Sequence, residues 1–285
     1  MCGARVDGST RALLRRYAAR YENAGFMMEP GDAAPRDPSW FMHQVEGDAN
    51  REATAFLASC LSFGSRSQFI PRIQALVDCA GGDVDGWVRG GLFERDVRCG
   101  CGECFYRFFT HGHMNAFLRE FRRLMDEHST LGGFVRARAG GDGFEAVRAI
   151  CGRFGRCAGA AVVPADAKSA CKRVCMFLRW MARDGSPVDL GLWSGFIDKA
   201  RLVMPLDTHV VRQAARLGLA SGAASSMSAA RRLTAVMSEV FPGDPLRGDF
   251  ALFGYGVSLR RTSRPQGGSS VRNVCEKAKG KALEQ

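Results

Sequence analysis

The sequence predicts an all-α protein. Apolar residues recur every three or four positions in several separate segments, which is the spacing of a helix with one buried face. Alternation of apolar and polar residues, the pattern of a half-buried strand, is nearly absent. Of the 285 residues, 46% are apolar, which is enough to build a buried core. We therefore expect about nine or ten helices of ordinary length.

The helical segments are separated by stretches rich in glycine and proline. The clearest helical patterns fall at residues 53–61, 114–125, 144–154, 174–181 and 233–240. The breaks fall at residues 30–38, 81–91, 140–143, 184–187 and 242–245. The glycine-rich stretch at residues 80–100 is a candidate boundary between two helical lobes.

The charge of the chain favours a polyanionic partner. Forty lysines and arginines face 29 acidic residues, a net charge of +11. The helical pattern stops after Val257, and residues 260–285 carry seven basic and two acidic residues. We expect a helical domain at residues 1–259 followed by a disordered basic tail at 260–285. Nucleic acid is the favoured partner, and a basic solubilising surface is the alternative.

The sequence also predicts a location. No stretch approaches the roughly 20 apolar residues of a membrane span, and arginines interrupt the first 20 residues, where a signal peptide would be apolar. We expect a cytoplasmic, nucleoid-associated protein without a membrane partner, in which most of the eleven cysteines are reduced and buried.

Residues 169–219 carry the strongest chemical signal. A helix is expected from about Ser169, with Lys172 in its first turn, and a second helix is expected from Asp207 or Thr208, after Pro205. As the cap of the second helix, Asp207 would accept backbone N–H bonds, which stabilise an ionised carboxylate. The positive end of the first helix disfavours an ammonium at Lys172, so a nucleophilic amine becomes accessible.

Such a pair suits cleavage of the glycosidic bond of a deoxynucleotide. The amine attacks the anomeric carbon of the sugar, and the carboxylate stabilises the oxocarbenium charge. The plain alternatives are a simple capping role for Asp207 and a solvated lysine at 172. Before the tail, the lysines are at positions 168, 172 and 199, and the other basic residues that carry a full charge are arginines. A lysine amine can lose its proton and an arginine cannot, so the choice of lysine at 172 favours a chemical role.

The segment around Asp207 resembles a known superfamily. Pro205 to Val210, with Arg212 and residues 216–219, resembles the segment that carries the catalytic aspartate of the helix-hairpin-helix DNA glycosylases related to endonuclease III. Together with residues 61–66, 172–181, 188–193 and 249–254, it resembles a bacterial family of that superfamily over about residues 48–257. The resemblance implies a two-lobed helix-hairpin-helix glycosylase-like fold with DNA in the cleft between the lobes.

The resemblance also implies roles for residues. Lys172 matches the Schiff-base lysine of the members with lyase activity, and Asp207 matches the superfamily aspartate. The implied function is base excision repair of double-stranded DNA, with an oxidised purine as the damaged base, no cofactor and no obligate protein partner. Two features depart from the superfamily: residues 164–168 lack the glycines of the DNA-gripping hairpin, and the cysteine cluster that holds iron and sulfur in many relatives is missing.

Two further groups of residues are candidates for binding. Asp249 and Phe253 share one face of a short predicted helix, so a carboxylate could bond a base edge while a ring stacks on the base. The alternative is a capping aspartate followed by a core phenylalanine. The resemblance places seven residues at the DNA: Gly64, Ser65, Arg66, Gln68, Arg173, His209 and Arg212. Arg66 and Gln68 lie in the loop from which relatives insert a side chain into the DNA gap.

A rival signal comes from one cluster of metal-ligand residue types. It comprises Cys99, Cys101, Cys104, His111 and His113. Thiolates and imidazoles suit zinc, but only the spacing of Cys101 and Cys104 is typical of zinc sites, so we expect reduced cysteines and no metal. Two alternative functions remain open: a non-catalytic nucleic-acid-binding protein that retains the fold, and a metal-stabilised helical interaction protein.

Overall fold

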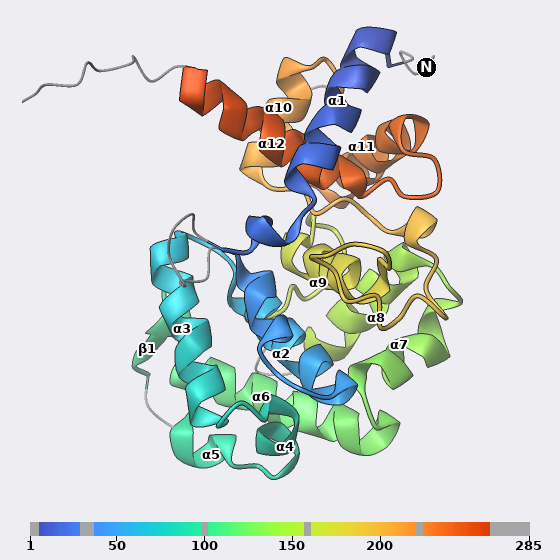
Figure 1. Cartoon of the computed structure of the whole chain (residues 1–285). Helices are drawn as coiled ribbons and strands as arrows, with labels where there is room; N and C mark the ends of the chain where they lie inside the picture. Colours follow the sequence, from blue (N-terminus) through green and yellow to red (C-terminus); the bar gives the residue numbers. More distant parts are fainter. Residues whose placement is uncertain (1–5, 29–36, 98–101, 157–160, 221–224, 263–285) are drawn as a thin grey trace, which may run out of the picture.

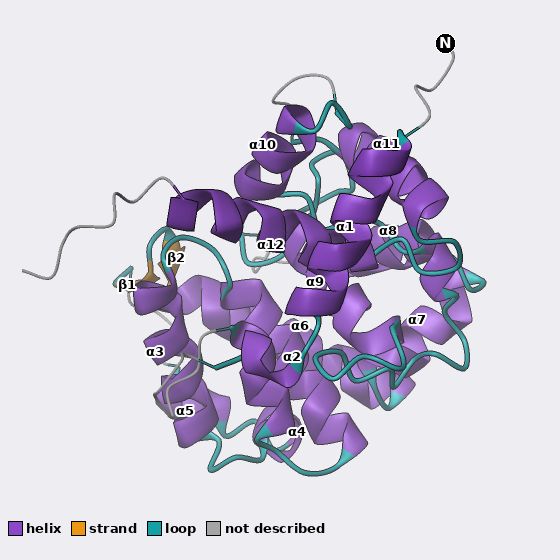
Figure 2. Ribbon diagram, turned by 45° about the horizontal axis from the view of Figure 1, so that its top comes forward, coloured by secondary structure: helices purple, strands orange, loops and turns teal. Residues whose placement is uncertain are grey.

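The computed structural model describes residues 6–28, 37–97, 102–156, 161–220 and 225–262. Over these ranges the chain is mostly helical, which confirms the all-α prediction (Figures 1 and 2). The described strands form one short antiparallel hairpin, in which β1 (Cys104–Tyr106) pairs with β2 (Phe109–Thr110). None of the described helices is both long and apolar enough to cross a membrane.

The α-helices are α1 (Gly8–Tyr21), α2 (Asp48–Leu61), α3 (Arg66–Cys79), α4 (Val84–Arg89), α5 (Phe93–Asp96), α6 (His111–His128), α7 (Leu131–Ala139), α8 (Gly143–Phe154), α9 (Lys172–Ala182), α10 (Thr208–Arg216), α11 (Met227–Val240) and α12 (Arg247–Thr262). Short 3₁₀ helices are η1 (Ala24–Phe26), η2 (Pro38–His43) and η3 (Lys199–Arg201). The five predicted helical segments lie within α2, α6, α8, α9 and α11, whereas α1, α3, α4, α5 and α7 lie outside them.

Helix α2 is the centre of the larger group of helices. Every residue from Glu52 to Leu61 is buried, and the helix packs against η2, α3, α4, α7 and α9. Helix α9 is buried from Val174 to Ala182. Because these two helices are covered on all sides, the loops at their ends are held in fixed positions on the core.

Two groups of helices meet at α9. Helices α1, α10, α11 and α12 pack together in the upper part of Figure 1, and α2 to α8 form the lower part. The glycine-rich stretch at residues 80–100 does not separate these groups, which corrects the expected boundary. Gly82 and Gly91 have positive φ and turn the chain on either side of α4, whose Val84 and Trp87 are buried within the lower group.

The last described helix is longer than the short helix predicted around Asp249. Helix α12 extends to Thr262, and its side packs against α1, α10 and α11. Residues 263–285, most of the predicted basic tail, lie outside the described residues.

Candidate active site

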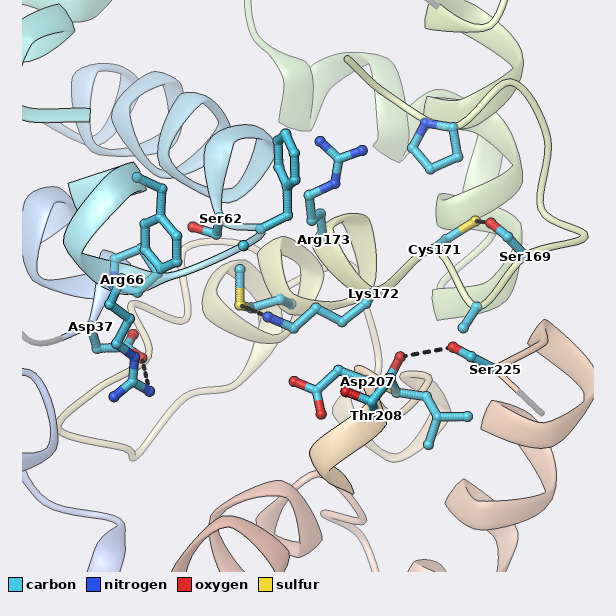
Figure 3. Close-up of a pocket in the computed structure, with 18 residues that line it drawn as sticks. Asp37, Ser62, Arg66, Ser169, Cys171, Lys172, Arg173, Asp207, Thr208 and Ser225 are labelled. Atoms are coloured by element: carbon cyan, nitrogen blue, oxygen red, sulfur yellow. Dashed lines mark hydrogen bonds and ion pairs between the residues drawn. The ribbon is translucent and has the colours of Figure 1, made fainter. Parts of the chain in front are cut away.

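Two adjoining pockets lie at the starts of α9 and α10. The larger extends toward the loop before α3, and the smaller extends toward α12. The larger has a volume of about 570 Å³ and the smaller about 80 Å³. Both are lined by Asp37, Arg66, Lys172, Met176 and Asp207, so they are two parts of one site. Figure 3 shows the larger pocket, with Lys172 and Asp207 extending into it from different helices.

Lys172 is the first residue of α9, as the predicted place in a first turn requires. The residue before it, Cys171, has a φ of 45°, and this left-handed turn marks the start of the helix. The Nζ atom lies 3.5 Å from Met176 Sδ and forms no ion pair with a described residue. The neighbouring lysines differ: Nζ of Lys168 lies 3.4 Å from Asp166, and Nζ of Lys199 lies 2.5 Å from Asp184.

Asp207 caps α10, which confirms the predicted cap. Its Oδ1 accepts hydrogen bonds from the backbone N–H groups of His209 at 2.9 Å and Val210 at 2.8 Å. These bonds fix the orientation of the carboxylate, and its Oδ2 bonds to none of the described residues. A carboxylate held in this way, in one pocket with an amine that forms no ion pair with a described residue, can stabilise a positive charge that forms between them.

The smaller pocket has aromatic walls. The ring centroid of Phe253 lies 5.0 Å from that of Phe26 and 6.2 Å from that of His209. Burial lowers the pKa of His209, and its buried Nε2 has no hydrogen-bond partner among the described residues. The smaller pocket thus combines these aromatic rings with charged side chains, among them Arg66, Lys172 and Asp249.

Asp249 also lines the smaller pocket, where a buried ion pair holds it. Its Oδ2 accepts a hydrogen bond from Arg179, and it lies in the first turn of α12 rather than at the helix cap. Burial raises the pKa of Asp249; the charge of Arg179 opposes this, Asp207 adds to it and Lys172 opposes it. The three groups Lys172, Asp207 and Asp249 thus lie close enough to influence one another's charge.

A network of buried ion pairs continues from Arg179, the partner of Asp249. Arg179 Nε donates to Asp189 Oδ1 at 3.1 Å, and Arg183 donates to the other oxygen of Asp189. Arg183 also donates to Asp244 at 2.8 Å and to Glu22 at 2.5 Å. Burial lowers the pKa of Arg183, but the bond to Asp244 and the charge of Asp189 raise it above its ordinary value. The network ties α9 to both α12 and the end of α1.

The predicted DNA-contacting loop lies at the edge of the site. Gly64 and Arg66 line the larger pocket, while Ser65 and Gln68 are exposed at the start of α3. Arg66 turns toward the pocket: its Nη2 lies 4.0 Å from Asp37 Oδ2, and its guanidinium carbon lies 5.8 Å from the ring centroid of Phe253. Figure 3 shows the contact with Asp37.

The other three residues expected at DNA occupy different positions. Arg173 lines the larger pocket, but its Nη1 donates to the carbonyl of Cys60 and its guanidinium carbon lies 5.0 Å from the ring centroid of Phe63. His209 lines the smaller pocket. Only Arg212 of the three is exposed.

The metal-ligand cluster is only partly within the described residues. Cys99 and Cys101 lie outside them. Cys104 Sγ donates to the carbonyl of Arg107, and His113 Nδ1 accepts from the backbone N–H of Thr110. Across the described ranges no three histidine, cysteine or acidic side chains gather in a group that could hold a metal.

Sequence reasoning missed several residues of the site. Asp37, Phe26 and Met176 line it, and each has a signal too weak to find in one sequence. Arg179 had a usable signal, because a charged residue inside the apolar stretch from Val174 to Met181 must have a buried partner.

Comparisons with known proteins give a family but no activity. No curated protein and no solved structure matches the chain significantly. One family model, described as "Protein of unknown function (DUF2400)", matches residues 37–258, a span that contains the large pocket and every described residue proposed above for it. The chain therefore belongs to the DUF2400 family.

Proposed function

We propose that the protein is a DNA glycosylase with AP-lyase activity and a helix-hairpin-helix glycosylase-like fold. It removes a damaged base, an oxidised purine, from double-stranded DNA. The observation that carries the proposal is the meeting of Lys172, whose amine has no ion pair with a described residue, and the capped carboxylate of Asp207 in one pocket. The sequence resemblance and the net charge of +11 support DNA as the substrate.

The reaction follows from these two groups. The neutral amine of Lys172 attacks C1′ of the sugar, the C1′–N bond to the base breaks, and the base leaves with the bonding electrons and takes up a proton. Asp207 stabilises the positive charge that develops on the sugar. Opening of the sugar ring leaves an imine between Lys172 and C1′. Loss of a proton from C2′ then breaks the C3′–O bond and cuts the strand, and water releases the amine.

In this proposal the extruded base occupies the larger pocket, and one edge of the base reaches into the smaller pocket. Phe253 and Phe26 offer ring surfaces for stacking, and Asp249 offers Oδ1, which bonds to none of the described residues. Arg179 holds the carboxylate in place, so recognition depends on an oriented acceptor or, when the group is protonated, an oriented donor.

Reduction with borohydride tests the catalytic assignment. On duplexes that each contain one damaged base, we expect the wild-type protein to form a permanent adduct with DNA, because borohydride reduces the imine. Lys172→Gln should form no adduct and cut no strand. Lys168→Gln and Lys199→Gln should form adducts at the wild-type rate, because these lysines are paired with aspartates away from Asp207.

Two other results would contradict the assignment. An adduct that persists in Lys172→Gln and disappears in Lys168→Gln would move the nucleophile to Lys168, in the segment before α9. Tight DNA binding by the wild type without an adduct on any damaged or abasic duplex would favour the non-catalytic nucleic-acid-binding protein.

Base recognition is tested by Asp249→Asn. We expect this variant to keep its fold but to change the order of preference among damaged bases, because an amide offers one donor and one acceptor where the carboxylate offers oxygens. Single-turnover rates over the same panel of duplexes measure the change. An unchanged order of preference would limit Asp249 to its ion pair with Arg179.

A further inference from the structure

An aromatic side chain projects from the β-hairpin beside the site. The turn between β1 and β2 consists of Arg107 and Phe108, and 63% of the Phe108 side chain is exposed. Among the described residues, Leu92 is the other large hydrophobic side chain with comparable exposure. Contact of an aromatic ring with water is unfavourable. An exposed ring on an otherwise well-packed hairpin is therefore typical of a binding surface.

The hairpin is anchored on the wall of the larger pocket. Tyr106 donates a hydrogen bond from its hydroxyl to the carbonyl of Phe63, a residue that lines this pocket. The ring centroid of Phe63 lies 4.8 Å from that of Tyr106, 4.9 Å from Phe109 and 5.1 Å from Phe108. Phe108 is thus the outermost ring of an aromatic cluster that begins inside the site.

Two side chains of the hairpin also pack closely on the loop that contains Gly64. A Cβ added to Gly64 would lie 2.6 Å from Arg107 Nη1 and 2.9 Å from the Tyr106 hydroxyl. Gly64 has a φ of 84°, and Arg107 has a φ of 55°, so both sides of the contact use left-handed backbone. These contacts and the neighbouring rings of Phe63 and Phe109 fix the position of the exposed Phe108 ring.

We propose that Phe108 stacks on the DNA bases at the position that the extruded nucleotide has left. This inference rests on the proposed function. Apolar side chains that enter a base stack replace the lost stacking contacts and keep the extruded nucleotide from returning. Ordered before binding, the hairpin loses little conformational entropy when its ring inserts.

This assignment differs from the expectation that Arg66 or Gln68 fills the gap. Arg66 is directed toward Asp37 and the Phe253 ring in the smaller pocket. Gln68 is exposed, but it offers an amide instead of a ring. Of the three, Phe108 has the largest flat surface outside the pocket, and Arg107 beside it places a positive charge where phosphates would pass.

The test uses a duplex with a tetrahydrofuran abasic site opposite 2-aminopurine. We expect Phe108→Ala to weaken binding to this duplex by about 5- to 150-fold, the loss that follows from removing one stacked base–ring contact. Affinity for the same duplex without the abasic site should change less than twofold. Phe108→Trp should bind this duplex as tightly as wild type. The abasic duplex should quench the fluorescence of this variant more than that of the wild type. Leu92→Ala, which removes the other large exposed apolar side chain among the described residues, should bind as wild type.

The outcomes separate this inference from the proposed function. Equal binding of wild type and Phe108→Ala to the abasic duplex would overturn the role of Phe108, even if borohydride trapping by Lys172 succeeds. Equal loss of affinity for the abasic and the intact duplex would also overturn it, because that result indicates a general surface contact. Thermal unfolding of both variants checks that the hairpin change has not altered the fold.

Discussion

Asp207→Asn lowers the single-turnover rate of base release by roughly 10² or more, if the proposed function holds. This is the scale lost when one preorganised charged group at a reacting centre is removed. The amide oxygen can still accept the capping bonds that Asp207 Oδ1 receives from His209 and Val210, so the start of α10 should keep its geometry. Rapid-quench measurements of base release on saturating duplex give the rate.

Binding and capping controls make this result specific. Affinity for an abasic-site analogue should stay within a few-fold of wild type, because Asp207→Asn removes a negative charge and leaves the basic side chains that contact phosphates in place. Asp83→Asn is a matched control, since Asp83 caps α4 through a bond from Gly86 at 3.0 Å and does not line either pocket. An unchanged rate in Asp207→Asn would reduce Asp207 to a structural cap.

Among these substitutions, we expect Asp189→Ala to lower the free energy of unfolding the most. It leaves the buried guanidinium groups of Arg179 and Arg183 without their shared carboxylate. Removing one partner of a buried ion pair costs about 3–5 kcal/mol of unfolding free energy, because the remaining charge keeps its desolvation cost. Urea denaturation of the variant measures the loss.

An exposed ion pair provides the comparison. Glu145 and Arg148 lie 3.0 Å apart on α8 with 43% and 60% of their side chains exposed. Glu145→Ala should therefore lower the unfolding free energy by only about 0–1 kcal/mol. Equal losses of unfolding free energy in the two variants would mean that Asp189 does not stabilise the buried ion pairs of Arg179 and Arg183.

Local patterns in the sequence are enough to predict the major helices and the first layer of the site. Helices α2, α6, α8, α9 and α11 have long apolar stripes, and the cap at Asp207 depends on residues only two and three positions away. These features are local, so one sequence contains them.

Features that depend on distant parts of the chain could not be predicted. The ion pair between Arg179 and Asp249 joins residues 70 positions apart, and Phe26 reaches the small pocket from the other end of the chain. The β-hairpin is too short for an alternating pattern, and its rings pack on Phe63 from a different segment. Helix α4 was missed because its flanking glycines suggested a break, whereas burial of Trp87 stabilises the short helix.

The packing of α1 on α12 has a consequence for synthesis of the protein. Leu14 and Ala18 are fully buried, and α1 packs mainly on α12, which is the last described helix of the chain. During translation α1 leaves the ribosome long before α12, so its apolar face stays uncovered until α12 follows. Phe26, Asp249 and Phe253 come from these two ends, so the smaller pocket is completed last. A nascent chain that stops before Arg247 lacks this pocket even when the lower group of helices has already folded.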